Sequence, residues 1–190
     1  LELYKSIAEN KGIIFFNADD DILTSNLPEH IEKISYSSMT NGDVQGELIT
    51  LNPYVRMRWN YGAIHSDEIQ TQMIGKYNFY NFLASIAIGS HFGVEPEEIS
   101  EAIAAYAPSN NRSQVEKTGR NTLIMDAYNA NPTSMTSALE SFAFIEHEDK
   151  IAILGDMFEL GTESEQEHQK IMNLIQFLNV PAICIGVQFH

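Results

Sequence analysis

The sequence lacks the features that mark a secreted or membrane-embedded protein. Its one cysteine, Cys184, excludes an intrachain disulfide. It lies in the apolar run Ile183–Val187, and we expect it to be a buried strand side chain. No apolar run approaches the roughly 18 residues of a membrane span. The chain also does not open on a basic segment followed by an apolar one. We therefore expect a cytoplasmic protein without membrane insertion.

Basic residues are scarce as well. The 190 residues include 11 Lys and Arg against 26 Asp and Glu, a net charge of −15. This charge repels nucleic acid and anionic membranes at long range, so we exclude nucleic acid as a partner. A nucleotide is still compatible with it, because one Arg and a few backbone N–H groups can outweigh a distant acidic surface.

Three further absences bear on the possible sites and on the extent of the chain. The sequence contains neither G-x-x-x-x-G-K-[ST] nor G-x-G-x-x-G, the usual phosphate-binding loops. His30, His65, His91 and His147 show no metal-ligand spacing, so we predict no metal site within the chain. The chain also has no initiating Met and stops directly after an apparent core strand. We expect it to be a fragment of a longer protein.

What is present predicts an α/β fold. The apolar run Ile13–Phe16 ends in polar residues, which is typical of a buried parallel strand. Between Ile34 and Ile74, short alternating segments with Asn-Gly punctuation favour an antiparallel patch added to that sheet. Apolar residues then recur at helical spacing over residues 78–92 and 95–106, so we expect two helices that pack together.

A second domain is predicted after residue 107. The segment 107–111, Ala-Pro-Ser-Asn-Asn, is typical of a linker, and we divide the chain into domains 1–107 and 108–190. Strands that alternate with helices predict an incomplete, parallel, Rossmann-like sheet in the second domain. The expected strands are 122–126, 151–154 and 182–187, and the expected helices are 133–145 and 164–178.

Four polar motifs follow one another along the chain. They read G-K-Y-N-F-Y-N with L-A-S-I-A, N-R-S-Q, D-A-Y-N-A-N-P-T-S-M, and L-G-D-M-F-E-L-G with a downstream histidine. In the same order, they are similar to four features of the Mur ligase family. These are G-x-H-N-x-x-N-x-L-A-A-x-A, an arginine at the domain junction, D-S-Y-N-A-N-P-x-S-M, and L-G-D-M-x-E-L-G with a downstream histidine. The segments are Gly75–Ala87, Asn111–Gln114, Asp126–Met135 and Leu154–Gly161 with His168.

The chain thus resembles the Mur ligases, and the last two motifs resemble the MurF branch in particular. Order and spacing agree over nearly the whole chain. One position departs from the family, because Tyr77 stands where it usually has His. A tyrosine donates a hydrogen bond and stacks, but it is not a cation at neutral pH. This puts in question any role that needs a charged imidazole there.

The resemblance implies a fold and a reaction. Residues 1–107 would be the end of the central ATP-binding domain, a parallel sheet with a small antiparallel patch and helices, and residues 108–190 part of the C-terminal ligase domain. The full-length enzyme, a monomer, would use ATP and Mg²⁺ to add D-alanyl-D-alanine to UDP-MurNAc-tripeptide through an acyl phosphate in peptidoglycan synthesis. Its Mg²⁺ ligands would lie mainly outside this chain, which would be inactive alone.

The first motif supplies candidates for ATP binding. Asn78 and Asn81 lie three residues apart at the start of a predicted helix, so both amides face one side. The resemblance implies that both bind ATP and that Asn81 contacts the base, since an amide offers the donor and acceptor that a purine edge needs. A purely structural N-cap role for Asn78 is the alternative.

The second and third motifs supply an arginine and a carboxylate. The resemblance implies that Arg112 is catalytic and binds the γ-phosphate of ATP, which suits a planar donor that neutralises charge on a transferring phosphoryl group. The alternative is a solvated surface charge. Asp126 closes a predicted strand, where α/β sheets bind ligands. The resemblance gives it the ATP ribose, and capping of the loop is the alternative.

The remaining candidates belong to the substrates. The resemblance places Tyr128 and Asn129 near the acyl and amine substrates. Asn131 is a further candidate, although its place before Pro132 also predicts a helix N-cap. Three candidates from the fourth motif are Asp156, which closes a strand, Glu159, which is also a candidate cap, and His168, whose apolar neighbours equally predict a structural histidine.

Two alternatives to the MurF reading stay open. The chain could be a non-catalytic module that keeps a Mur-like fold for nucleotide or ligand binding. It could also belong to a related ligase, of the Mur or folylpolyglutamate type. A phosphate-binding G-x-x-G-K-[ST] upstream of this chain would favour a ligase over the module.

Overall fold

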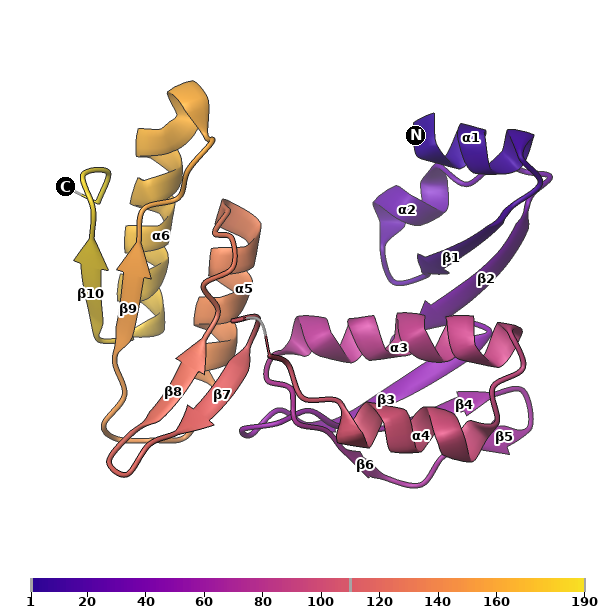
Figure 1. Ribbon diagram of the computed structural model, residues 1–190. Helices are drawn as coiled ribbons and strands as arrows, with labels where there is room; N and C mark the ends of the chain where they lie inside the picture. Colours follow the sequence, from indigo (N-terminus) through magenta and orange to yellow (C-terminus); the bar gives the residue numbers. More distant parts are fainter. Residues whose placement is uncertain (1, 110, 190) are drawn as a thin grey trace. The chain divides into compact units, whose positions relative to one another are not determined.

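The computed structural model describes residues 2–109 and 111–189. The chain divides into two compact units (Figure 1). The first comprises Leu1–Thr50, Val55–Gln72 and Tyr77–Tyr106, and the second comprises Leu51–Tyr54, Met73–Lys76 and Ala107–His190. In the part of the chain that the structure describes, no helix combines the length and apolar character needed to span a membrane.

A mixed sheet forms the first unit. Its order is β1-β2-β3-β4-β5, with β6 also beside β4. β1, β2 and β3 run parallel, whereas β4 is antiparallel to β3, β5 and β6. Helix α1 (Glu2–Glu9) precedes β1, and α2 (Asp21–Ser25) follows it. The strands are β1 (Ile13–Asn17), β2 (Glu32–Ser37), β3 (Val44–Thr50), β4 (Arg56–Tyr61), β5 (Ile64–His65) and β6 (Ile69–Gln70).

The antiparallel part begins later than the sequence predicts. Ile34 lies in β2, which is parallel to both of its neighbours. A parallel neighbour normally requires a long crossover. Here β2 and β3 pair only at Tyr36–Val44 and Ser37–Gln45, so β3 starts beside the end of β2 and the short link 38–43 suffices.

The two predicted helices are α3 (Lys76–His91) and α4 (Pro96–Ala105). The α3 side chains Phe79, Leu83 and Ile86 are fully buried. A Cβ at Gly46 of β3 would overlap the side chains of Leu83 and Phe79, so a glycine lets α3 approach the sheet closely. The sheet and α3 therefore share one apolar core, and α3 belongs to the first unit from Tyr77 onward.

The second unit alternates strands and helices. Its elements are β7 (Gln114–Lys117), β8 (Thr122–Met125), α5 (Pro132–Ala143), β9 (Ala152–Gly155), the 3₁₀ turn η1 (Gly161–Glu163), α6 (Ser164–Leu178) and β10 (Ala182–Ile185). β9 and β10 pair in parallel through the α6 crossover, and α5 and α6 lie side by side (Figure 1). Buried residues of α5, β9, α6 and their connections form its core: Met135, Leu139, Ala152, Met157, Ile171, Ile175 and Val180.

One strand of this unit, β7, is not predicted from the sequence. β8 pairs antiparallel with β7, whereas we expected residues 122–126 to join the parallel sheet. β7 reads Gln-Val-Glu-Lys, and a single apolar residue gives no periodic signal. The hairpin is closed at Thr118, whose N–H donates to the Asn121 carbonyl at 2.8 Å. Local turn geometry thus decides which neighbour β8 takes.

Candidate functional site

Two loops at the open end of the β7–β8 hairpin bring the second and third motifs together. The Arg112 loop is residues 111–113, and the Tyr128 loop is residues 126–128. The Ala127 N–H donates to the Asn111 carbonyl at 2.8 Å, and the Ser113 N–H donates to Oδ1 of Asp126 at 3.2 Å. The guanidinium carbon of Arg112 lies 3.8 Å from the centroid of the Tyr128 ring. Each residue of one loop therefore contacts one residue of the other.

The backbone of the Arg112 loop is constrained on both sides of the arginine. Asn111 has a φ of 56° and Ser113 a φ of 52°, a left-handed conformation that side chains other than glycine adopt at a cost. Ser113 is buried, at 4% exposure. The Asn111 N–H also donates to Oε1 of Gln114 at 3.2 Å. These contacts hold the backbone of the Arg112 loop in an unfavourable conformation. The Arg112 side chain therefore extends from a fixed backbone position.

The Tyr128 loop continues into helix α5. Asn129 is exposed in the link. Asn131 is the N-cap of α5: its Oδ1 accepts from the Ser134 N–H at 2.9 Å, and the Ser134 hydroxyl completes a capping box. The predicted N-cap role of Asn131 is confirmed. Asp126, Tyr128 and Asn129 are all exposed, so they are accessible to a ligand.

In the first unit, the asparagine pair lies in the first turns of α3. Asn78 is buried, at 4% exposure, and its Oδ1 accepts from Nδ2 of the exposed Asn81 at 3.2 Å. The helix starts at Lys76, so Asn78 is inside the helix and is not its N-cap. Because the Asn81 Nδ2 donates to Asn78, the Asn81 amide is held in one orientation and presents a fixed edge to solvent.

A carboxylate outside the four motifs supports this helix. Asp19, just after β1, accepts from the backbone N–H groups of Ser38 and Thr40 at 2.6 and 2.8 Å, and from Met39. It also accepts from the Tyr80 hydroxyl at 3.2 Å. Tyr80 lies between Asn78 and Asn81 in the sequence, so Asp19 ties the loop after β2 to α3.

These contacts change two pKa values. Partial burial alone would raise the pKa of Asp19, but the hydrogen bonds from Ser38, Thr40 and Met39 outweigh it and hold the pKa below its ordinary value of 3.8. Burial, together with the negative charge of Asp19, raises the pKa of Tyr80 to about 12. The pair is therefore ionised at Asp19 and neutral at Tyr80 at physiological pH.

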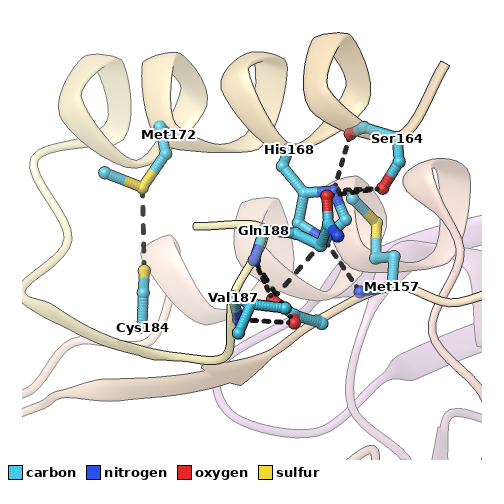
Figure 2. Close-up of polar contacts among 8 residues, drawn as sticks. Met157, Ser164, His168, Met172, Cys184, Val187 and Gln188 are labelled. Atoms are coloured by element: carbon cyan, nitrogen blue, oxygen red, sulfur yellow. Dashed lines mark hydrogen bonds and ion pairs between the residues drawn. The ribbon is translucent and has the colours of Figure 1, made fainter. Parts of the chain in front are cut away.

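The fourth motif forms a buried polar cluster around His168 (Figure 2). His168 is 1% exposed. Its Nε2 accepts from the Met157 N–H at 2.9 Å, and Nδ1 lies 2.7 Å from the Ser164 carbonyl oxygen. Since Nε2 accepts, the proton is on Nδ1, which donates to Ser164. The 3.9 Å separation of Nε2 from Asp156 is therefore no ion pair.

Asp156 also makes contacts within the fold. Its carboxylate accepts from the Val187 N–H at 2.8 Å and from the Gln188 N–H at 3.2 Å. A Cβ at Gly186, where φ is 143°, would overlap this carboxylate. Asp156 and His168 thus join the ends of β9 and β10 to α6.

Glu159 is exposed in the loop before η1, with a φ of 65°.

Cys184 lies in a strand, as expected, but its side chain is half-buried and not fully buried. It lies in β10, with its Sγ 3.7 Å from Sδ of Met172 (Figure 2). Burial raises the pKa of its thiol. Among the residues that the structure describes, no three His, Cys, Asp or Glu side chains are grouped so that they could hold a metal ion.

Comparison with known proteins gives the family. The model of the Mur ligase middle domain matches residues 1–89, and that of the Mur ligase glutamate ligase domain matches residues 111–186. The chain belongs to the Mur ligase family.

Relatives of this Mur ligase chain include UDP-N-acetylmuramoyl-tripeptide--D-alanyl-D-alanine ligases. That of Mycobacterium tuberculosis is 31% identical over 185 residues, which cover 93% of this chain and 36% of the relative. That of Bacillus subtilis is 37% identical over 100 residues, 52% of this chain and 22% of the relative. The chain therefore spans well under half the length of these curated relatives.

Solved Mur ligase structures share the fold. MurF from Acinetobacter baumannii matches with a TM-score of 0.81 at 24% identity, over 94% of this chain and 39% of that one. MurF from Thermotoga maritima, solved in complex with ADP, matches with a TM-score of 0.79 at 16% identity, over 94% and 41%. The predicted family and the predicted α/β fold class are confirmed. The roles of the individual Mur ligase residues stay predictions.

Proposed function

We propose that this chain is part of an ATP-dependent amide ligase of the MurF type, which adds D-alanyl-D-alanine to UDP-MurNAc-tripeptide in peptidoglycan precursor synthesis. One observation carries the proposal: the Arg112 loop and the Tyr128 loop lie against each other, in a chain related over 93% of its length to a UDP-N-acetylmuramoyl-tripeptide--D-alanyl-D-alanine ligase. Arg112, which would neutralise phosphate charge, and Asp126, which would bind the ribose, thus lie on two loops that contact each other.

The reaction proposed for the full-length protein has two steps. The terminal carboxylate of the tripeptide attacks the γ-phosphorus of ATP, so that ADP leaves and an acyl phosphate forms. The amine of D-alanyl-D-alanine then attacks the acyl carbon, phosphate leaves, and the amine loses a proton. Phosphorylation turns a poor leaving oxygen into a good one, and the protein mainly aligns the reactants and neutralises charge.

The candidate residues divide between the two units. Asn81, oriented by Asn78, would contact the adenine base from the first unit. Arg112 and Asp126, in the second unit, would contact the γ-phosphate and the ribose. We propose the domain boundary between residues 107 and 108. This is supported by family matches that end at residue 89 and restart at residue 111.

The fourth motif and the α5 loop are proposed to serve the substrates. Asn129 is exposed and available for direct contact. His168, Asp156 and Asn131 have hydrogen-bond partners within the fold, so we propose that they act by shaping the loops around exposed groups such as Glu159. No described cluster suits Mg²⁺, and we assign no step to a metal. We further propose a cytoplasmic enzyme that is a monomer at full length.

Phosphate release by the full-length protein tests the function. With ATP and UDP-MurNAc-tripeptide present, we expect release to depend on D-alanyl-D-alanine, and D-alanine alone to give little. The purified 190 residues should release no ADP under the same conditions. Release that is indifferent to the dipeptide would rule out the MurF assignment, and a full-length protein that releases no phosphate at all would favour a non-catalytic module.

A further inference from the structure

We propose that Tyr128 is a positioning residue: its ring stacks on Arg112 and holds the guanidinium in the orientation that receives the phosphate. This inference rests on the proposed function, because it concerns the arginine that would bind the γ-phosphate. It gives Tyr128 a role through Arg112 instead of the direct substrate contact that the resemblance implies.

The geometry places the two groups in van der Waals contact. The Arg112 guanidinium carbon is 3.8 Å from the centroid of the Tyr128 ring, well within the roughly 6 Å of a cation–π contact. A guanidinium that stacks by its face keeps its N–H donors at its edge, in the plane of the group. Stacking on Tyr128 therefore fixes Arg112 without using the donors that a phosphate needs.

Core packing does not account for an aromatic residue at this position. The Tyr128 side chain is 64% exposed, so the ring removes little apolar surface from water. Arg112 is exposed as well. An exposed arginine normally samples many rotamers, and a stacking partner reduces that freedom before the ligand arrives. The contact thus serves the orientation of Arg112 better than it serves the fold.

The backbone beneath the stacked pair is held independently of the Arg112 and Tyr128 side chains. The Ala127–Asn111 and Ser113–Asp126 hydrogen bonds lie on either side of it. Both are made by groups other than the Tyr128 ring, so removal of the ring leaves the loops in place. Tyr128 is also two residues from Asp126, so one short loop would both bind the ribose and orient the phosphate-binding arginine.

Kinetics of the full-length protein separate positioning from direct substrate contact. Tyr128→Phe keeps the ring and should keep kcat near wild type. Tyr128→Leu should lower kcat by about 5-fold or more, while KM for ATP and for D-alanyl-D-alanine changes little. Tyr106→Leu, at another exposed tyrosine (53%), is the matched control and should resemble wild type. If Phe is as defective as Leu, or if KM for the dipeptide rises in both, Tyr128 contacts substrate and the proposal is wrong.

A second readout requires no ligand and no activity. In full-length protein labelled with ¹⁵N at arginine, the ring current of Tyr128 should shift the Arg112 Nε–H resonance upfield, with Arg112→Lys identifying the peak. The shift should persist in Tyr128→Phe and vanish in Tyr128→Leu. A wild-type peak that is identical to that of Tyr128→Leu overturns the stacking. If the shift is present while phosphate release fails to depend on the dipeptide, the proposed function fails and the stacking stands.

Discussion

Gly186 and Asp156 are matched in size across the ends of β9 and β10. The carboxylate of Asp156 occupies the space that a Cβ at Gly186 would take, and φ at Gly186 is 143°. Both the space and the backbone conformation therefore favour glycine at this position.

Gly186→Ala should destabilise the chain by about 2 kcal/mol or more, since it combines a strained φ with a displaced carboxylate. Urea unfolding of the wild type and the variant measures this. Gly155→Ala is the matched control, because a Cβ there meets nothing within 4 Å. Equal losses of stability in the two variants would show that the contact with Asp156 contributes nothing.

Asp19 links single-residue chemistry to the pH dependence of stability. Its folded pKa lies below the ordinary value of 3.8, so its contribution is present above pH 3.8 and is lost as the pH falls through the folded pKa. Asp19→Asn should therefore be less stable than wild type near neutral pH, with a difference that shrinks below pH 3.8. Asp67→Asn, which removes an exposed carboxylate of the same unit, is the matched control and is measured over the same pH range. Parallel stability curves for wild type and Asp19→Asn would contradict this account.

Among the elements, α5 depends on its N-terminal cap. Asn131 and Ser134 exchange side-chain and backbone hydrogen bonds, and Pro132 occupies the first helical position. Asn131→Ala should cost about 1 kcal/mol of unfolding free energy, as for other N-cap asparagines. Thr133→Ala, an exposed change in the same turn, serves as the control. If the two variants are equally stable, the cap does not stabilise α5.

The elements that the sequence predicts best are those with a strong period. The expected helix over residues 164–178 is found at Ser164–Leu178, because Ile171 and Ile175 recur at helical spacing on a buried face. β7 is missed because its apolar content is a single valine. The parallel pairing of β2 with β3 is missed because strand register depends on a loop conformation that periodicity does not encode.

The contacts within the candidate site could be predicted only in part. Arg112 and Asp126 are identified by motif, and the structure places their loops in contact. The stacking of Arg112 on Tyr128 and the left-handed backbone at Asn111 and Ser113 have no signal in the sequence. The Arg112–Tyr128 contact joins the segment before β7 to the segment after β8, and only the folded β7–β8 hairpin brings these two segments together.

At the scale of the whole molecule, we propose that Asn81, Arg112 and Asp126 all bind ATP in the full-length protein. Asn81 in α3 and the Arg112 and Tyr128 loops belong to different units of the chain. The chain spans 36% of its mycobacterial relative, so activity is a property to be measured on the full-length protein.

Steady-state kinetics of full-length variants with ATP varied tests this claim most directly. Asn81→Ala and Asp126→Asn should each raise KM for ATP by about 10-fold. Arg112→Ala should lower kcat by about 10³-fold, and all three should leave KM for D-alanyl-D-alanine near wild type. Arg120→Ala, at an exposed arginine in the β7–β8 turn, is the control. Wild-type kcat and KM for ATP in all three variants would contradict the assignment of Asn81, Arg112 and Asp126 to ATP binding.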